Sequence, residues 1–560
     1  MELLLNIIHS LKWLTVFELF LCILNFVVLI WYAVPIKKYY RWVDFLPSIG
    51  VVICIISIIY GDITYLSLAF YILTLVIFLC TVKKIFKPTN NIPVPKHRIL
   101  RGIICFTGVI LMLLAIMSSG EIRYNPVSNL SNMSYAKAFV RMNERMSIEY
   151  PFGGLKKIDW KALKDKYEPI FEKADKYKDK DLYYKTLREY LYSIRDGHIK
   201  IINENLDVRK NEVGGGFGIS TIQLDDGRVL VDLVLKDSPS DKSGIKLGAE
   251  IIKWDGKSGK EALANTSWTD NPVATNENKL YEQGRFMVRA QIGKEVQVEF
   301  KNMDENEIRK ATLKAYDDNY ETLTKTKVTL VKGEDPVDSK ILDNGYGYIK
   351  IKYFLNTDTC NVEKVIEEAL KMFQDNNIKG LIIDLRNNPG GDDDMVANIS
   401  GHFTNEEKFY EYVSYYNKYT KKFEINDSET RIINPSKLHY DGKIAILINS
   451  KTGSSGEGMP IILKGLPNIK IIGFTPTNGS FGVISSPIEF NMPEGYVIHV
   501  PDGRSLNKDK IIQGDSDYAG YGGGVPDIKI PLNEENFKEK YINGKDVELD
   551  YAIDTLTQNN

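Results

Sequence analysis

The chain contains little cysteine, with five residues among 560. Four of them, Cys22, Cys54, Cys80 and Cys105, lie in apolar stretches near the N-terminus, and only Cys360 lies beyond these. A single thiol cannot form a disulfide framework or a cysteine-based metal site. We therefore interpret all five cysteines as buried structural thiols.

Metal motifs, phosphate loops and a positive charge excess are also missing. The six histidines include no His-Glu-x-x-His motif, and no phosphate-binding loop ends in Gly-Lys-Ser/Thr. Charged residues make up 26% of the chain, with a net charge of -2. Because a nucleic-acid-binding protein would show a basic excess, we expect no nucleic-acid partner. Because the metal and phosphate motifs are missing, we also expect no metal and no cofactor.

Long apolar runs occur only in the first 120 residues. A bilayer span needs roughly 20 apolar residues. The candidate stretches are residues 11–34, 45–60, 65–82 and 100–118. The connections at residues 37–41 and 83–101 are basic, whereas the turn at residues 61–63 has no positive charge, so both termini are expected outside a bacterial cell membrane. A cleaved signal peptide is the alternative for the first stretch, which lacks a basic n-region.

Residues 121–208 have a polar-rich helical pattern that ends in the triplet Asp196-Gly197-His198. A glycine-rich segment, residues 214–219, then precedes a strand-like run and a Gly-Ile-Lys-Leu-Gly segment. This order resembles a PDZ domain as found inside bacterial processing proteases. The resemblance implies that the glycine loop binds a terminal carboxylate while the polypeptide adds as a strand. The implied binding residues are Gly215, Gly216, Phe217 and Gly218. An ordinary glycine turn is the alternative.

Strands and helices alternate beyond residue 325. We expect strands at residues 346–354, 380–385 and 443–448, and helices at residues 362–373 and 457–466. This alternation predicts an α/β core with a partly parallel sheet.

A serine-rich turn joins the third of these strands to the second helix. Its sequence is Thr452-Gly453-Ser454-Ser455-Gly456-Glu457. At a helix start the backbone N–H groups point outward and the helix dipole is positive, so an oxyanion is stabilised there. An ordinary helix N-cap is the alternative.

A second turn, Leu385-Arg386-Asn387-Asn388-Pro389-Gly390-Gly391, follows a buried strand. Its paired glycines let the backbone approach a ligand closely. Together the two turns resemble the C-terminal processing peptidase (tail-specific protease) and tricorn-like family of serine peptidases, over most of residues 135–535. The resemblance implies a crotonase-like core and a nucleophile three residues before the glutamate, which selects Ser454. It also implies an oxyanion hole formed by the N–H of Ser455 and that of Gly390 or Gly391.

A serine nucleophile needs a positioned base. One branch of the family uses a lysine downstream of the serine, but Ser480 occupies that position and excludes such a Ser–Lys dyad. The tricorn-like branch uses a histidine that precedes the PDZ domain, and His198 matches that place. The resemblance therefore implies His198 as general base, acting near a pKa of about 6.5. A packing or surface role is the alternative.

The acid that orients this histidine is less clearly marked. A histidine base needs an acceptor at its second nitrogen, which this branch takes from the C-terminal part of the core. No glutamate lies in residues 513–527, so Asp515 and Asp517 are the candidates, with surface loop positions as the alternative. Asp196 is expected to be too close to His198 in sequence to contact its ring easily. Arg386 and Asp384 are expected to anchor their turn.

The expected fold class is multidomain. Its parts are a four-helix transmembrane region (1–120), a helical lead-in (121–208), a PDZ-like β domain (209–318) and an α/β crotonase-like (ClpP/crotonase) peptidase core (319–560). The expected function is a membrane-anchored serine endopeptidase that cleaves extracytoplasmic polypeptides through an acyl-enzyme, its PDZ domain binding free C-termini. The expected partners are polypeptides and the lipid bilayer. An inactive homologue that senses peptides, and an esterase or small-peptide hydrolase, remain as alternatives.

Overall fold

The computed structural model describes residues 127–327, 334–417 and 421–558, which divide into two compact units. The described part of the smaller unit comprises residues 127–151, 415–417, 421–424 and 484–502. In it, α6 (Tyr135–Glu149) accompanies three short strands. Strand β1 (Ser128–Asn129) pairs in parallel with β19 (Ile488–Asn491), and β19 pairs antiparallel with β20 (Val497–Val500).

The membrane region of the predicted fold class is corrected by the structure. No helix among the described residues is both long and apolar enough to cross a bilayer. The fold class that the described residues support is a multidomain α/β fold, in place of the predicted class with a four-helix transmembrane region. The four predicted spans, in residues 1–120, lie outside the described residues.

The larger unit begins with helices α7 (Trp160–Tyr177), α8 (Lys180–Ser193) and α9 (Leu206–Val213). Each helix starts at an Asp or Asn whose side chain accepts a backbone N–H of the first turn, as at an N-cap. Helices α7 and α8 pack through aromatic side chains, with the rings of Tyr167 and Tyr190 edge to face at 5.6 Å. The predicted helical character of this segment is confirmed.

A mostly antiparallel sheet follows in the order β10-β9-β6-β5-β4. Its strands are β4 (Ile219–Gln223), β5 (Val229–Val234), β6 (Glu250–Trp254), β9 (Glu295–Lys301) and β10 (Arg309–Lys314). Helix α12 (Asn276–Met287) packs so closely on β4 that a Cβ at Gly284 would lie 2.1 Å from the Thr221 carbonyl oxygen. The PDZ assignment and the boundaries of this domain remain predictions.

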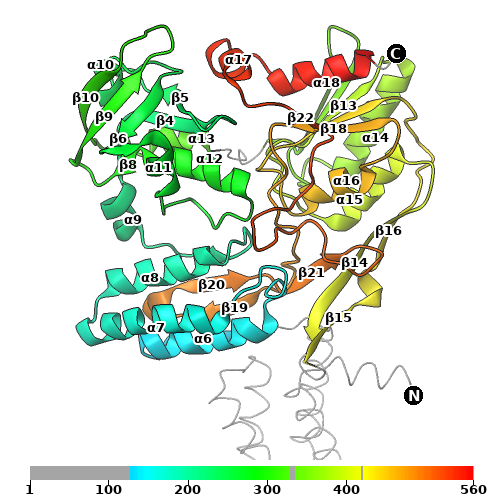
Figure 1. Ribbon diagram of the computed structural model, residues 1–560. Coiled ribbons are helices and arrows are strands. Elements are labelled where there is room, and N and C mark those ends of the chain that lie inside the picture. Colours follow the sequence, from blue (N-terminus) through cyan, green and yellow to red (C-terminus); the bar gives the residue numbers. More distant parts are fainter. Residues whose placement is uncertain (1–126, 328–333, 418–420, 559–560) are drawn as a thin grey trace, which may run out of the picture. The chain divides into compact units, whose positions relative to one another are not determined.

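The last part of the chain is a sheet flanked by helices (Figure 1). The strand order is β11-β12-β13-β17-β18-β22. The strands are β11 (Val337–Ile341), β12 (Gly347–Ile351), β13 (Leu381–Asp384), β17 (Ile444–Leu447), β18 (Ile469–Gly473) and β22 (Ile528–Lys529). All pairs are parallel except β11 with β12. Every residue of β13 and β17 is buried, as expected for strands covered on both faces. The predicted α/β core is confirmed.

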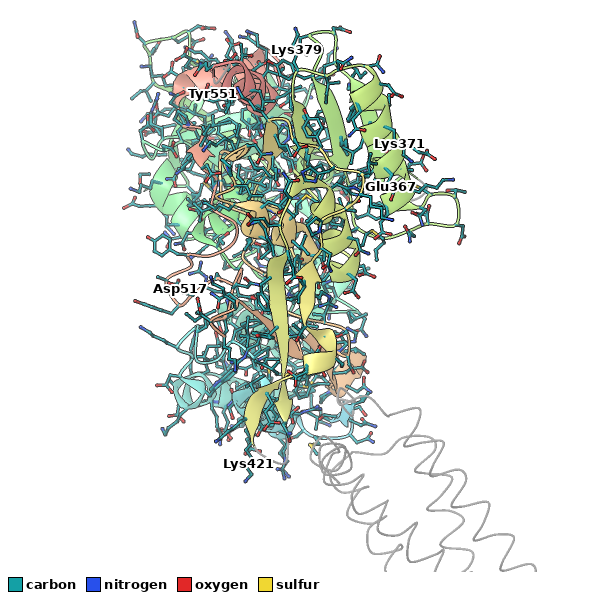
Figure 2. All side chains as sticks on the ribbon, turned by 90° about the vertical axis from the view of Figure 1, so that its right-hand side faces the viewer. Glu367, Lys371, Lys379, Lys421, Asp517 and Tyr551 are labelled. Atoms are coloured by element: carbon teal, nitrogen blue, oxygen red, sulfur yellow. The ribbon has the colours of Figure 1, made fainter. Side chains whose placement is uncertain are left out.

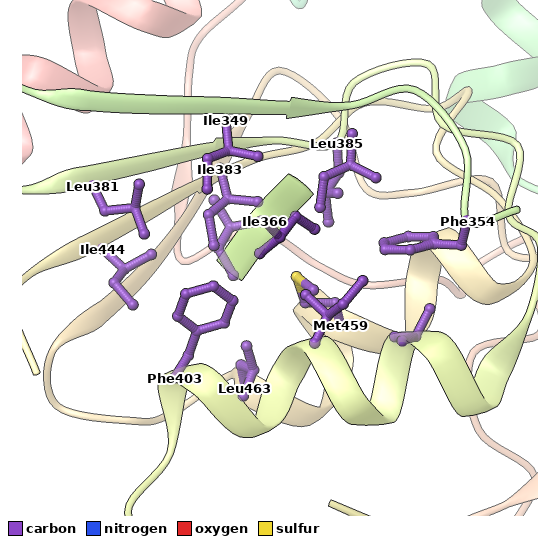
Figure 3. Close-up of a cluster of buried hydrophobic side chains, with 14 of the residues drawn as sticks. Ile349, Phe354, Ile366, Leu381, Ile383, Leu385, Phe403, Ile444, Met459 and Leu463 are labelled. Atoms are coloured by element: carbon purple, nitrogen blue, oxygen red, sulfur yellow. The ribbon is translucent and has the colours of Figure 1, made fainter. Parts of the chain in front are cut away.

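Each face of this sheet has its own apolar core. On one face, Ile349, Ile383 and Ile444 pack against helices α14 (Val362–Asp375), α15 (Asp393–Ser400) and α16 (Ser455–Leu463) (Figure 3). On the other face, Ile382, Ala445 and Leu447 pack against α18 (Val547–Gln558). Glu367 and Lys371 lie on the outer side of α14 (Figure 2), so this helix is amphipathic.

Removal of one central side chain is expected to destabilise this core. Ile383 is fully buried, and Ile383→Ala should lower the free energy of unfolding by about 2–5 kcal/mol because the cavity cannot be refilled. Ile432→Ala, at a position 42% exposed, is the matched control and should have little effect. Urea unfolding monitored by circular dichroism measures both, and equal losses would contradict the assigned core.

Candidate active site

The two glycine- and serine-rich turns lie side by side. Strands β13 and β17 are parallel neighbours, so their carboxyl ends meet at one edge of the sheet, where α/β proteins place their sites. The N–H of Gly453 donates to the Asn388 carbonyl at 2.8 Å. The Asn449 side-chain amide donates to Asn387 Oδ1 at 2.7 Å. The structure therefore brings together the two turns that the sequence singled out.

Ser454 has an unusual backbone conformation. It directly precedes α16, with φ 51° and ψ -135°, and its side chain is partly exposed. Non-glycine residues rarely adopt such angles, and strain of this kind gathers at functional sites. The Ser454 carbonyl accepts the N–H of Glu457 at 2.8 Å. A strained serine between a strand and a helix has the geometry of a nucleophile elbow.

Two backbone N–H groups beside Ser454 have no acceptor among the described residues. Ser455 is the first residue of α16, where an N–H has no partner inside the helix. The N–H of Gly391 is the second. The N–H of Gly390, in contrast, donates to Asn388 Oδ1 at 2.8 Å. Of the three predicted oxyanion-hole residues, Ser455 and Gly391 therefore have available donors.

Gly390 contributes by its small size. Its φ is 108°, and a Cβ at this position would lie 2.7 Å from the Ser454 Cβ. No side chain fits there unless the serine turn moves. The hydroxyl of Ser455 donates to the Gly391 carbonyl at 2.9 Å, which ties the second turn to the helix start.

Glu457 is a buried anchor for the segment around Ser480. Its carboxylate accepts the N–H of Gly479 at 2.9 Å, the N–H of Ser480 at 2.8 Å and the Thr477 hydroxyl. Burial raises the pKa of Glu457 to about 7, although these hydrogen bonds favour the charged form. The Ser480 carbonyl in turn accepts the N–H of Ser454 at 2.9 Å. From the sequence, Glu457 served only to identify Ser454, which lies three residues before it, and no role was predicted for Glu457 itself.

Ser480 also contacts the loop that carries His198. The N–H of Gly197 donates to Ser480 Oγ at 3.1 Å, and a Cβ at Gly197 would lie 2.8 Å from the same oxygen. Ser480 thus lies between the backbone of Ser454 and the backbone next to His198. The structure brings the predicted nucleophile and the predicted base to one locality, although 256 positions separate them (454 - 198).

The His198 ring is buried, with 7% of the residue exposed. Its Nδ1 has no hydrogen-bond partner, and the Asp196 Oδ1 lies 3.9 Å away while accepting the His198 N–H at 2.8 Å. No hydrogen bond reaches Nδ1 from the described residues, so the expectation that Asp196 does not easily contact this ring remains a prediction. Burial lowers the pKa of His198 below its ordinary value, and Asp196 opposes this effect.

The two predicted acids have different environments, and no hydrogen bond links either one to the His198 ring. Both carboxyl oxygens of Asp515 are buried without a partner among the described residues, and burial, reinforced by Asp196, raises its pKa well above the ordinary value. Asp517 accepts the N–H groups of Ala519 at 2.8 Å and Tyr521 at 3.0 Å in an outlying turn (Figure 2).

Lys156 is a buried residue that the sequence did not single out. Its Nζ donates to the Arg195 carbonyl at 3.0 Å, to the Ser516 carbonyl at 3.0 Å and to Ser516 Oγ at 2.9 Å. Burial lowers its pKa, although Asp196 and Asp515 oppose the change. Lys156 thereby holds the loop of His198 against residues 515–516. A lone lysine in a polar helical segment carries no signal of such a role.

The predicted carboxylate-binding loop is buried. Residues 214–218 are inaccessible, the N–H of Gly216 donates to the Tyr316 carbonyl at 3.0 Å, and the Phe217 ring packs on Trp254 at 5.2 Å. Gly218 has φ 85°, and a Cβ there would lie 2.1 Å from the Ser238 Cβ. The ligand role of Gly215, Gly216, Phe217 and Gly218 remains a prediction.

The turn-anchoring role of Arg386 and Asp384 agrees with their contacts. Arg386 Nε donates to Asp384 Oδ1 at 3.0 Å, and its other nitrogens reach Asp384 and Asp546. Burial alone would raise the pKa of Asp384. The neighbouring cations Arg386 and Lys350 outweigh this effect and hold that pKa at about 2. Across residues 127–327, 334–417 and 421–558, no group of His, Cys, Asp and Glu side chains could hold a metal ion.

A strained serine, two available amides and a histidine loop, placed at the edge of an α/β sheet, are the parts expected of a serine peptidase core. Comparison with known sequences agrees, because residues 345–529 match the sequence profile of peptidase family S41. This part of the chain resembles that family, and relatives of the chain include proteins named carboxy-terminal processing proteases.

Several bacterial proteins are similar to the chain. The carboxy-terminal processing protease CtpA of Bacillus subtilis is 26% identical over 263 residues, which cover 46% of each chain. A probable CtpA-like serine protease of Staphylococcus aureus is 22% identical over 400 residues, covering 67% of this chain and 68% of that protein. The crystal structure of mature CPAF has a TM-score of 0.55 at 13% identity, covering 76% of this chain and 98% of that one, so this likeness concerns the fold alone. The chain spans about half the length, or less, of the first curated relatives that it matches.

The raised pKa of Glu457 predicts a pH-dependent effect on stability. The native state binds this proton more tightly than the unfolded chain, so the associated stability is complete below pH 4.5 and is lost as the pH rises through about 7. Glu457→Gln removes this titration. Urea unfolding at several pH values should therefore show that the stability of wild type relative to the variant declines between pH 4.5 and 7. Glu535→Gln, on the surface, is the control, and a difference independent of pH would contradict the assignment.

Proposed function

We propose that this protein is a serine endopeptidase that cleaves polypeptides through an acyl-enzyme, with Ser454 as nucleophile and His198 as general base. The strained conformation of Ser454, φ 51° and ψ -135° at the start of α16, carries the proposal, because it holds the hydroxyl beside two available backbone donors.

In the first step, Ser454 Oγ attacks the substrate carbonyl carbon while His198 takes the hydroxyl proton. The N–H groups of Ser455 and Gly391 stabilise the resulting oxyanion. His198 then gives the proton to the leaving amine as the peptide bond breaks. Water, deprotonated by the same histidine, attacks the acyl carbon. The ester bond to Ser454 Oγ then breaks, His198 returns the proton to that oxygen, and the acid product is released.

The orienting charge for His198 is assigned to Asp196. Its carboxylate lies 3.9 Å from Nδ1 and already holds the His198 backbone N–H. A small rotation of either side chain would produce a hydrogen bond, and catalytic hydrogen bonds are often long before substrate binds. Asp515 is the weaker candidate because no hydrogen bond joins its carboxyl group to His198 Nδ1 and because burial raises its pKa well above the ordinary value, which disfavours the charged form.

The segment at residues 209–318 is proposed to bind or gate polypeptide substrates and their C-termini, as a PDZ domain does. Strand β4 ends the sheet order β10-β9-β6-β5-β4, and an end strand can accept an additional strand. Helix α12 packs tightly on β4 at Gly284, so peptide addition requires these two elements to separate.

An inactive homologue that senses peptides is the second candidate function. It is favoured by one observation, namely that His198 Nδ1 is buried without a hydrogen-bond partner. The two candidates differ in whether Ser454 reacts with an active-site probe.

Ser454→Ala is expected to abolish peptide hydrolysis and fluorophosphonate labelling while the protein stays folded. The loss should be at least about 10³-fold, because the nucleophile is removed. Ser455→Ala is the matched control, since the proposed role of Ser455 uses its backbone N–H, and it should still be labelled. Mass spectrometry of the labelled peptide identifies the site. A wild-type protein that is never labelled would favour the sensor, and an adduct on another serine would refute the assignment.

His198→Gln is expected to lower kcat/KM by about 10²–10⁴-fold, the usual contribution of a general base. His439→Gln is the matched control and should retain activity. Because burial lowers the pKa of His198, kcat/KM in the wild type should rise with an apparent pKa below 6.5. Full activity of the His198 variant would exclude a Ser–His mechanism.

A further inference from the structure

Gly391, one of the two proposed oxyanion donors, is held by three hydrogen bonds of its neighbouring peptide groups. The carbonyl of Gly390 shares a peptide group with the Gly391 N–H, and it accepts the N–H of Phe354 at 2.9 Å. In the next peptide group, the N–H of Asp392 donates to the Phe354 carbonyl at 2.8 Å. The third hydrogen bond runs from the Ser455 hydroxyl to the Gly391 carbonyl at 2.9 Å. Because this third bond comes from a side chain, a neighbouring group can redirect it while the backbone bonds stay in place.

Asp393 lies beside this hydroxyl. It is the first residue of α15, two positions after Gly391, and it is half-buried. The hydroxyl of Tyr410, a fully buried residue, donates to Asp393 Oδ1 at 3.1 Å. A side-chain hydrogen bond also joins the Asp393 carboxyl group to the Ser455 hydroxyl. One carboxyl group therefore lies between a buried tyrosine and the hydroxyl that holds Gly391.

A second carboxyl group lies on a neighbouring strand. Glu411, on β14 (Lys408–Asn417), is only 1% exposed. Its Oε1 accepts a hydrogen bond from Arg431 Nη1 at 2.6 Å, at the start of β16 (Arg431–Ile433). Burial, reinforced by the nearby charge of Asp393, raises the pKa of Glu411 to about 8. The two carboxyl groups thus interact electrostatically, and one guanidinium cannot compensate both.

Charged or titratable groups surround Asp393 on its own helix, on β14 and β16, and on α16. They are Asp392, Asp394, Tyr410, Glu411, Arg431 and Glu457. Arg431 favours ionisation of Asp393, and Asp392 disfavours it. Glu457 is directed elsewhere, to the N–H groups of residues 479 and 480. Burial is the largest effect and raises the pKa of Asp393, so its proton is kept to a higher pH than on an exposed aspartate.

We propose that Asp393 is a positioning residue for the oxyanion hole and acts through the Ser455 hydroxyl, which rests on the function proposed above. When protonated, the Asp393 carboxyl group donates to Ser455 Oγ, and the Ser455 hydroxyl donates in turn to the Gly391 carbonyl. When ionised, the carboxylate only accepts, so the Ser455 hydroxyl turns to it and the Gly391 carbonyl loses this donor. The N–H of Gly391 is then less firmly placed, and the oxyanion is stabilised less.

The test measures how fast a fluorophosphonate–rhodamine probe labels Ser454 in the full-length protein at several pH values. The oxyanion hole affects this rate because the phosphonyl oxygen gains charge as Ser454 Oγ attacks phosphorus and fluoride leaves. The first-order labelling constant should fall about fivefold as the pH rises through the pKa of Asp393, the effect of losing one hydrogen bond, while the binding constant of the probe stays unchanged. Protonation of His198 acts in the opposite direction, because it slows labelling as the pH falls.

Three variants assign this fall to its cause. Asp393→Asn keeps the shape and a donor but cannot ionise, so it should be labelled as fast as wild type at low pH and should show no fall. Ser455→Ala should be about fivefold slower at every pH, and adding Asp393→Asn to it should change nothing further, because the shared hydroxyl is missing. Asp343→Asn, in the exposed turn between β11 and β12, is the matched control and should keep the wild-type profile.

Three results would overturn the proposal. They are a fall that persists in Asp393→Asn, a fall that persists in Ser455→Ala, and slow labelling of Asp393→Asn at every pH. Circular dichroism at each pH verifies that the compared proteins are folded. Failure of the proposed catalytic function looks different, because the wild-type protein would then form no adduct on Ser454 at any pH.

Discussion

The buried carboxyl group of Glu457 is the constraint on which the geometry of the site depends. It lies in the first turn of α16, three residues after Ser454, and holds the N–H groups of Gly479 and Ser480. The Ser480 carbonyl then holds the N–H of Ser454. One side chain thus fixes the turn before the helix and the loop that faces it. Burying this carboxyl group disfavours its charged form and raises its pKa. Hydrogen bonds from three donors offset part of that unfavourable burial.

Ser480 occupies the position at which one branch of the resembled family has a lysine, and this difference changes how the site is assembled. A lysine there would place base and nucleophile within the same core. Ser480 instead binds the backbone N–H of Gly197, so the proposed base depends on a loop from the helical lead-in. Lys156 holds that loop from the other side through the Arg195 carbonyl. The proposed activation of Ser454 by His198 therefore depends on packing between segments that are far apart in sequence.

Burial controls the charges around this loop. It lowers the pKa values of His198 and Lys156 and raises that of Asp515. A neutral histidine is the form that can accept a proton.

The local pattern alone was enough to predict the α/β alternation and the two turns, because buried strands, paired glycines and a helix start are encoded by neighbouring residues. The same pattern selects Ser454, whose role as nucleophile remains a prediction. The order of the strands was not predictable, since parallel pairing depends on contacts between distant segments. Side-chain contacts also determine which backbone N–H groups have an acceptor. The Asn388 side chain accepts the N–H of Gly390, whereas the N–H of Gly391 has no acceptor among the described residues. Sequence spacing likewise does not specify the turn that brings the Asp196 carboxylate to 3.9 Å from His198 Nδ1.

The sequence by itself thus indicated a kind of chemistry, with a serine at a helix start as the predicted nucleophile and a histidine as the predicted base in place of the missing lysine. Only the tertiary structure decided the anchoring of the site by Glu457, Ser480 and Lys156, and the position of Asp393 beside the Ser455 hydroxyl. The reason is physical. Local conformation follows from adjacent residues, whereas burial, charge compensation and hydrogen-bond occupancy are properties of segments that meet only when the chain is folded.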